Sequence, residues 1–66
     1  MKFRIIEAEV DVGVQDPFET VAPDALQAFE ANFGDADQFD VTLNKETGDL
    51  FATMPHGWMI WVSSTT

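Results

Sequence analysis

The chain has 66 residues and carries 12 acidic side chains against 3 Lys and Arg, which gives a formal net charge of −9. This balance disfavours direct binding to DNA, RNA or an anionic membrane, because proteins recognise those partners through Lys and Arg. The absence of Cys excludes disulfides and thiolate metal sites, and no apolar run approaches the length of about 18 residues that a membrane-spanning helix needs.

The first predicted element is a long strand over residues 2–14. From Ile6 onward apolar and acidic residues alternate, which is the period of a strand with one buried face. The apolar set is Ile6, Ala8, Val10, Val12 and Val14, and the acidic set is Glu7, Glu9 and Asp11. Gly13 marks either a bulge or the end of this strand.

A connector over residues 15–22 leads to a single predicted helix, which begins near Pro23 and ends at Gly34. Proline suits the first turn of a helix, where its missing N–H would have no partner, and glycine readily adopts the left-handed conformation that ends one. Apolar residues at helical spacing predict the face that packs on the core: Leu26, Phe29 and Phe33, with Ala22 and Ala25 on the same side.

Three more strands are predicted, over residues 38–44, 49–54 and 58–62. A loop over residues 45–48 joins the first two, with Gly48 in a positive-φ position, and a Pro-His-Gly turn joins the last two. The order β-α-β-β-β predicts an α+β domain over residues 1–62, with one helix packed on a four-stranded, mostly antiparallel sheet, and a flexible tail over residues 63–66. One helix covers one face of such a sheet, so the other face is open to solvent or to a partner.

The side chains that catalysis requires are scarce. There is one histidine, His56, in a predicted turn, no Tyr, and Ser only near the C-terminus, so we expect neither an enzyme nor a cofactor. The spacing of Asp35, Asp37 and Asp40 invites comparison with a calcium loop, but the central Gly and the terminal Glu of such loops are missing. We therefore interpret this segment as a solvated joint and expect no metal.

The acidic residues of the first strand suggest a function for the net charge. Alternate residues of a strand lie about 6.6–6.8 Å apart on one face, so Glu7, Glu9 and Asp11 form a row with a spacing close to that of phosphates along a nucleic-acid strand. A second acidic group comprises Glu30, Asp35, Asp37 and Asp40. Two interpretations remain open: a functional surface that enters a basic channel, or charge that serves solubility alone.

The C-terminal segment differs in character, because no Asp, Glu, Lys or Arg follows Asp49. Alternation places Met59 and Trp61 on the face opposite Ile60, and it places Phe51 on the face opposite its own strand neighbours. Either the last strand is central in the sheet, or Phe51, Met59 and Trp61 form an exposed patch for a partner or a second copy of the chain.

In size, charge and layout the chain resembles the small acidic inhibitors that bacteriophages and mobile elements direct against host defence, among them anti-CRISPR and anti-restriction proteins that mimic DNA. The residues carrying this resemblance are Glu7, Glu9, Asp11 and the acidic group within residues 30–40. The resemblance implies a cytoplasmic protein of a bacterial host that blocks the DNA- or RNA-binding site of a defence or DNA-processing complex. The alternative is a structural or adaptor module that docks through Phe51, Met59 and Trp61, with a homodimer as one form of it.

Overall fold

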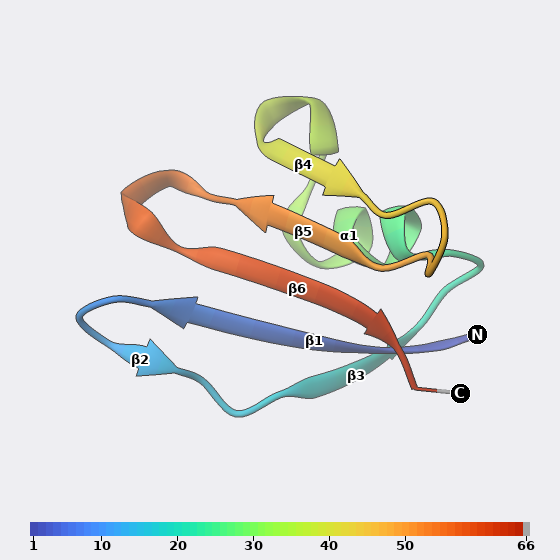
Figure 1. Ribbon diagram of the computed structural model, residues 1–66, viewed down its shortest axis with the longest axis horizontal. Coiled ribbons are helices and arrows are strands. Elements are labelled where there is room, and N and C mark those ends of the chain that lie inside the picture. Colours follow the sequence, from blue (N-terminus) through green and yellow to red (C-terminus); the bar gives the residue numbers. More distant parts are fainter. Residues whose placement is uncertain (66) are drawn as a thin grey trace.

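The computed structural model describes residues 1–65 and places them in an antiparallel sheet with one α-helix packed against it (Figure 1). The strands are β1 (Lys2–Glu9), β2 (Gly13–Val14), β3 (Phe18–Val21), β4 (Asp40–Leu43), β5 (Leu50–Thr53) and β6 (Met59–Ser64). The helix is α1 (Ala25–Phe33), and two 3₁₀ turns are η1 (Ala36–Gln38) and η2 (Pro55–Gly57). The predicted α+β class with one helix is confirmed. The prediction of four strands is wrong, because the described residues form six.

The strand order is β2-β1-β6-β5-β4, and β3 also pairs with β1. All the pairings are antiparallel. The last strand, β6, lies between β1 and β5, so the two ends of the sequence supply the centre of the sheet. Because β6 continues through Ser64, residues 63 and 64 belong to a strand and not to the predicted tail. The final residue of that tail, Thr66, lies outside the described residues.

The long first strand predicted over residues 2–14 is wrong in its second half. β1 ends at Glu9, and the chain turns back through residues 10–12 into β2. The Glu9 carboxylate stabilises this turn by accepting the backbone N–H groups of Asp11 at 3.1 Å and Val12 at 3.2 Å. Gly13 follows with φ +90°, a conformation that favours glycine. Val10, which the alternation assigned to a buried face, is 85% exposed at the turn.

β2 and β3 are two parts of one edge strand interrupted by a bulge. Between the Glu7–Gln15 backbone hydrogen bond and the Ile5–Phe18 pair, one residue of β1 faces two residues of the edge strand. Pro17 lies at this bulge, where its missing N–H removes no ladder hydrogen bond. The predicted connector over residues 15–22 therefore contains a strand.

Helix α1 begins one residue after its cap, Asp24, whose carboxylate accepts the Gln27 N–H at 2.8 Å. Pro23 precedes the cap, so its predicted place in the first turn is wrong. Gly34 ends the helix as predicted, with φ +106° and its N–H donating to the Glu30 carbonyl at 3.0 Å. No helix in the described part of the chain has the length and apolar character needed to cross a membrane.

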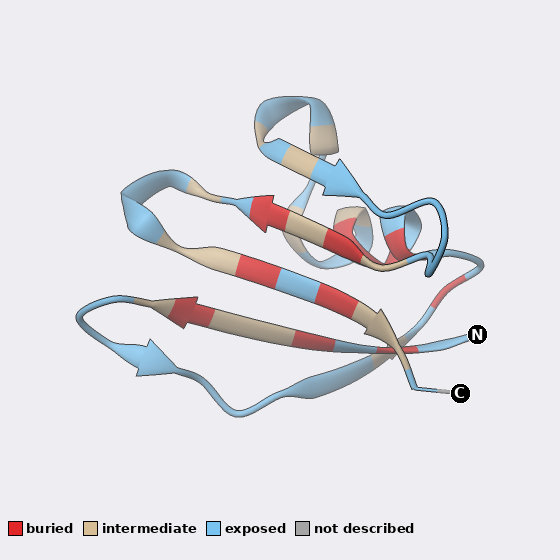
Figure 2. Cartoon of the chain, in the orientation of Figure 1, coloured by how far each residue is buried: buried red, intermediate tan, exposed pale blue. Residues whose placement is uncertain are grey.

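The core lies between α1 and the adjacent face of β1, β6 and β5, where buried residues are concentrated (Figure 2). The helix buries Ala25, Ala28 and Phe29, whereas Leu26 is 37% exposed, so the predicted stripe is rotated by about one position. The Phe29 ring lies at the centre of an aromatic group, 5.1 Å from the Phe33 ring centroid and 5.8 Å from that of Phe39. The sheet contributes Phe3, Ile5, Leu50, Ala52, Ile60 and Val62.

The capping hydrogen bond of Asp24 makes the first testable prediction. Asp24→Ala leaves the Gln27 N–H without its partner, and we expect a loss of about 1 kcal/mol in the free energy of unfolding. Asp24→Asn is the matched control, because it removes the same charge but keeps a capping oxygen. Urea denaturation followed by circular dichroism measures both. Equal losses for the two variants would assign the effect to charge and contradict the capping role.

Candidate interaction surface

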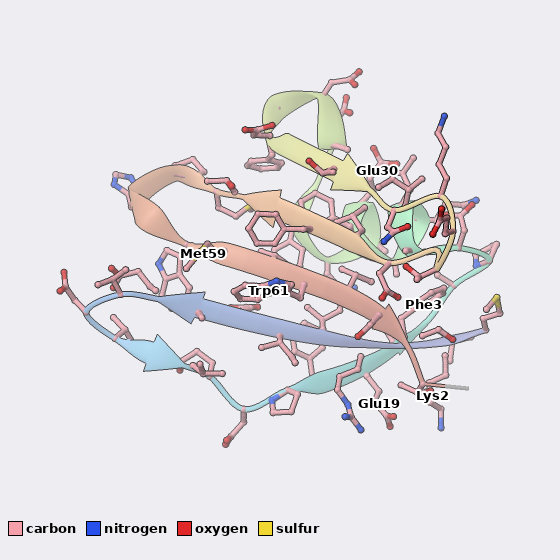
Figure 3. All side chains as sticks on the ribbon, in the orientation of Figure 1. Lys2, Phe3, Glu19, Glu30, Met59 and Trp61 are labelled. Atoms are coloured by element: carbon pink, nitrogen blue, oxygen red, sulfur yellow. The ribbon has the colours of Figure 1, made fainter. Side chains whose placement is uncertain are left out.

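The face of the sheet opposite α1 is covered by no other element of the described chain (Figure 1). Strand alternation places on it the residues that point away from the core, and three of them meet at the middle strand. Trp61 of β6 lies opposite Ile6 of β1 on one side and Phe51 of β5 on the other. Met59 lies two residues from Trp61 on the same face, as Figure 3 shows. We call Ile6, Phe51, Met59 and Trp61 the open-face patch.

The open-face patch contains a tilted pair of aromatic rings that is partly exposed. The ring centroids of Phe51 and Trp61 lie 5.2 Å apart with an interplanar angle of 48°, which fixes both rings against each other. Trp61 is 37% exposed, and the other three residues are half-buried. The structure therefore brings together Phe51, Met59 and Trp61, and β6 is a central strand whose second face is also uncovered. The alternative of a central last strand is confirmed, and the binding of a partner by Phe51, Met59 and Trp61 stays a prediction.

Few of the charged residues lie on the open face of the sheet. Arg4 and Glu19 lie opposite each other on the open face, where Lys2 also lies, and Asp40 lies on this face because its neighbour Val41 packs on the core. Figure 3 shows Lys2 and Glu19 at one corner of the sheet. Two cations and two anions give the strand residues that point to the open face a formal charge of 0. The other ten acidic residues and one Lys account for the whole net charge of −9.

The prediction that Glu7, Glu9 and Asp11 form a row on one face of the first strand is wrong. Glu7 points to the helix side of the sheet, on the same face of β1 as Phe3 and Ile5, and its neighbour across the sheet is Ile60. The Glu9 carboxylate is turned toward backbone N–H groups, and Asp11 lies in the turn beyond the strand. These three carboxylates do not form a straight line along one strand face.

The second acidic group lies at the joint between α1 and β4. The Glu30 carboxylate accepts the Ala36 N–H at 2.9 Å, and the Asp35 carboxylate accepts the Asp37 N–H at 3.0 Å. Asp40 then begins β4, at the opposite edge of the sheet from β2 (Figure 1). Four strand spacings between these edges amount to about 19 Å. Asp11 and Asp40 therefore belong to separate acidic groups with the open-face patch between them.

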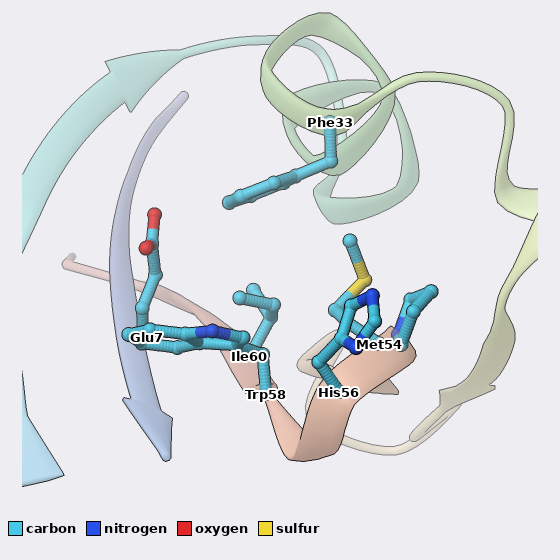
Figure 4. A pocket seen from close by; sticks show the side chains of 7 residues that line it. Glu7, Phe33, Met54, His56, Trp58 and Ile60 are labelled. Atoms are coloured by element: carbon cyan, nitrogen blue, oxygen red, sulfur yellow. The ribbon is translucent and has the colours of Figure 1, made fainter. Parts of the chain in front are cut away.

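A pocket that the sequence patterns missed lies on the helix side of the sheet, beyond the last turn of α1 (Figure 4). Its volume is about 330 Å³, and it is lined by Glu7, Phe33, Met54, Pro55, His56, Trp58 and Ile60. The sequence did indicate that Glu7 shares a strand face with Phe3 and Ile5, because residues two apart lie on the same face of a strand. The alternation that begins at Ile6 instead predicted Glu7 on the face opposite the core.

The turn at the mouth of this pocket has an unusual backbone. His56 has φ +65° and Gly57 has φ +84°, the combination of two positive angles that tight hairpin turns use. Histidine is, with asparagine and aspartate, among the residues other than glycine that adopt positive φ more often than most. Within residues 1–65, no group of three or more His, Asp or Glu side chains is arranged to hold a metal ion.

Comparisons of the chain with protein-family models, with curated protein sequences and with solved structures found no match.

Proposed function

We propose that this protein acts by binding and not by catalysis, and that it docks through its open sheet face onto a basic partner protein. The contrast in charge carries this proposal. The strand residues that point to the open face have a formal charge of 0, while the remainder of the chain carries −9. Aromatic and methionine side chains with a polar rim are typical of protein–protein interfaces. In this arrangement the patch supplies affinity, and the acidic rim attracts the partner.

Charge complementarity favours a basic protein over a second copy of the chain. Two copies docked face to face would bring together two chains that each have a net charge of −9, and their acidic rims would repel each other around the contact. A partner rich in Lys and Arg around an apolar patch gains attraction from the same rim. Nucleic-acid-binding proteins form one class with such surfaces. The DNA- or RNA-binding complex expected from the sequence is therefore one candidate for the basic partner.

The size of the face is adequate for a specific complex. A standard interface buries about 800 Å² of each partner. That area is about a fifth of the 4352 Å² accessible surface of this protein, a share that one sheet face and its rim can supply.

The test is affinity capture from a bacterial lysate with three tagged proteins, followed by mass spectrometry of what each one retains. The wild type is compared with a patch variant carrying Phe51→Thr, Met59→Thr and Trp61→Thr, in which threonine preserves strand propensity. The matched control is Leu26→Ala, which removes a side chain of similar exposure (37%) on the helix side. Circular dichroism verifies that each variant is folded.

We expect the wild type and Leu26→Ala to retain a protein with excess Lys and Arg that the patch variant does not retain. Association should also slow as salt rises from about 50 mM to about 500 mM, because the screening length shortens from more than 10 Å to a few Å. Equal retention by the patch variant would overturn the proposal. A wild-type dimer that Trp61→Thr dissociates, detected by analytical ultracentrifugation, would assign the face to a second copy instead.

The same assay separates docking from nucleic-acid mimicry. A mimic contacts its target through carboxylates, so Asp11→Lys with Asp37→Lys should abolish capture. Docking through the open-face patch predicts that the partner is still captured, because both aspartates lie outside the patch. Complete loss with this charge variant, together with full retention by the patch variant, would favour mimicry.

A further inference from the structure

The pocket beyond α1 is lined by apolar side chains apart from Glu7 and His56. Phe33 closes it from the helix, while Trp58 and Ile60 form the wall on β6 and the residue before it (Figure 4). Met54 and His56 complete the side nearest the turn. At about 330 Å³ the pocket is at the small end of the range of ligand sites, which is about 300–1,000 Å³.

Glu7 extends from β1 toward the region between the Phe33 and Trp58 rings, as Figure 4 shows. Its side chain is half-buried, and no described residue donates a hydrogen bond to its carboxylate or forms an ion pair with it. The next carboxylate on the same side of the strand, Glu9, accepts two backbone N–H groups. A cation that enters the pocket would therefore find a carboxylate with no ionic partner of its own.

The aromatic residues of the pocket suit the same kind of ligand. The face of an indole or phenyl ring attracts a cation, and Trp is the strongest of the aromatic side chains in this respect. Trp58 and Phe33 provide two such rings beside the Glu7 carboxylate. The net charge of −9 on the whole chain adds a long-range attraction for cations.

The scarcity of hydrogen-bond acceptors selects the type of cation. A primary ammonium presents three N–H donors and a guanidinium presents five, and each needs acceptors when it leaves water. The lining offers the Glu7 carboxylate and the His56 ring as its polar side chains. A quaternary ammonium has no N–H to satisfy, and its methyl groups can contact the rings and the side chains of Met54 and Ile60. We propose that this pocket binds a quaternary ammonium group, independently of the open-face patch.

The test is an NMR titration of the wild-type protein, followed through the Trp58 indole N–H and the Ile60 methyl signals. Choline is compared with 3,3-dimethyl-1-butanol, which has the same shape and no charge. We expect saturable shifts with choline and binding at least about tenfold weaker for the neutral alcohol, because cation–π and ionic contacts are absent in the latter. Equal binding of the two compounds, or no saturable shift of either signal with choline, would overturn the proposal.

Two variants with the same change in net charge locate the site. Glu7→Gln should weaken choline binding about tenfold, because it removes the carboxylate between the rings. Asp11→Asn removes an exposed carboxylate from the nearby turn and should leave binding within about twofold of the wild type. Equal weakening by both variants would assign the attraction to the overall field and contradict a built site.

The source of the ligand is distinguished by a second arm of the titration. Phosphatidylcholine vesicles present the same head group on a membrane, whereas choline presents it free in solution. Shifts of the Trp58 and Ile60 signals with both probes would indicate a lipid head group. Shifts with choline alone would indicate a small soluble compound. Either pattern supports recognition of the quaternary ammonium, which the wild-type comparison with the neutral alcohol tests on its own.

Discussion

Phe29→Ala is expected to remove about 3–5 kcal/mol from the free energy of unfolding, the largest effect of any substitution considered for this protein. The side chain is 0% exposed and packs against the Phe33 and Phe39 rings, so its removal leaves a cavity between helix and sheet. A domain of 66 residues has a total stability of roughly 3–10 kcal/mol. We therefore expect most molecules of this variant to be unfolded at 37 °C.

Urea denaturation followed by tryptophan fluorescence measures this loss. Leu26→Ala is the matched control, because it shortens an apolar side chain on the same helix that is 37% exposed, and we expect it to cost under about 1 kcal/mol. A similar, small loss for both variants would show that the aromatic group is not the centre of the core.

Trp61→Ala is expected to weaken partner binding about 30-fold or more, which corresponds to about 2 kcal/mol. Trp61 lies on the central strand of the sheet, with Ile6 on one side and Phe51 on the other. A partner docked on this face would therefore cover the part of the Trp61 ring that its neighbours leave exposed. Binding energy at interfaces concentrates in such enclosed aromatic side chains. The free protein should also lose about 1–3 kcal/mol of stability, because the removed ring contacts Phe51 and lies beside Ile6.

Isothermal titration calorimetry with the captured partner separates these two effects. Leu43→Ala is the control for binding, since Leu43 is 45% exposed but lies on the helix side of the edge strand β4. An affinity change below threefold for Trp61→Ala would contradict docking through the open-face patch. A large change for Leu43→Ala alone would move the interface to the edge of the sheet.

Part of the acidic composition has a role in local structure. Several carboxylates have local structural partners: Asp24 caps α1, Asp35 caps η1, and Glu9 and Glu30 accept backbone N–H groups in turns. Local capping therefore accounts for part of the acidic composition without any partner. The resemblance to nucleic-acid mimics stays a prediction about function, and its expected row of carboxylates along β1 is replaced by two separate groups.

Several features follow from short stretches of the sequence. The helix end at Gly34, the positive φ of Gly48 and the opposite facing of Trp61 and Ile60 were all predictable, because each depends on neighbours within a few residues. The net charge and its absence from the C-terminal segment are also properties of the sequence itself. These features were sufficient for the α+β class and for three residues of the open-face patch, whereas Ile6 had been assigned to the buried face.

The tertiary structure decided where strands break and which face each one presents. An alternating segment fits a straight strand and a hairpin equally well, and the choice at Glu9 depends on pairing with β3 and with the distant β6. The face of Glu7 follows from the register that sets Ile5 opposite Val62, residues 57 apart in the chain. Patterns of period two or 3.6 carry no information about such long-range contacts, because they record which residues are apolar and not which surfaces meet.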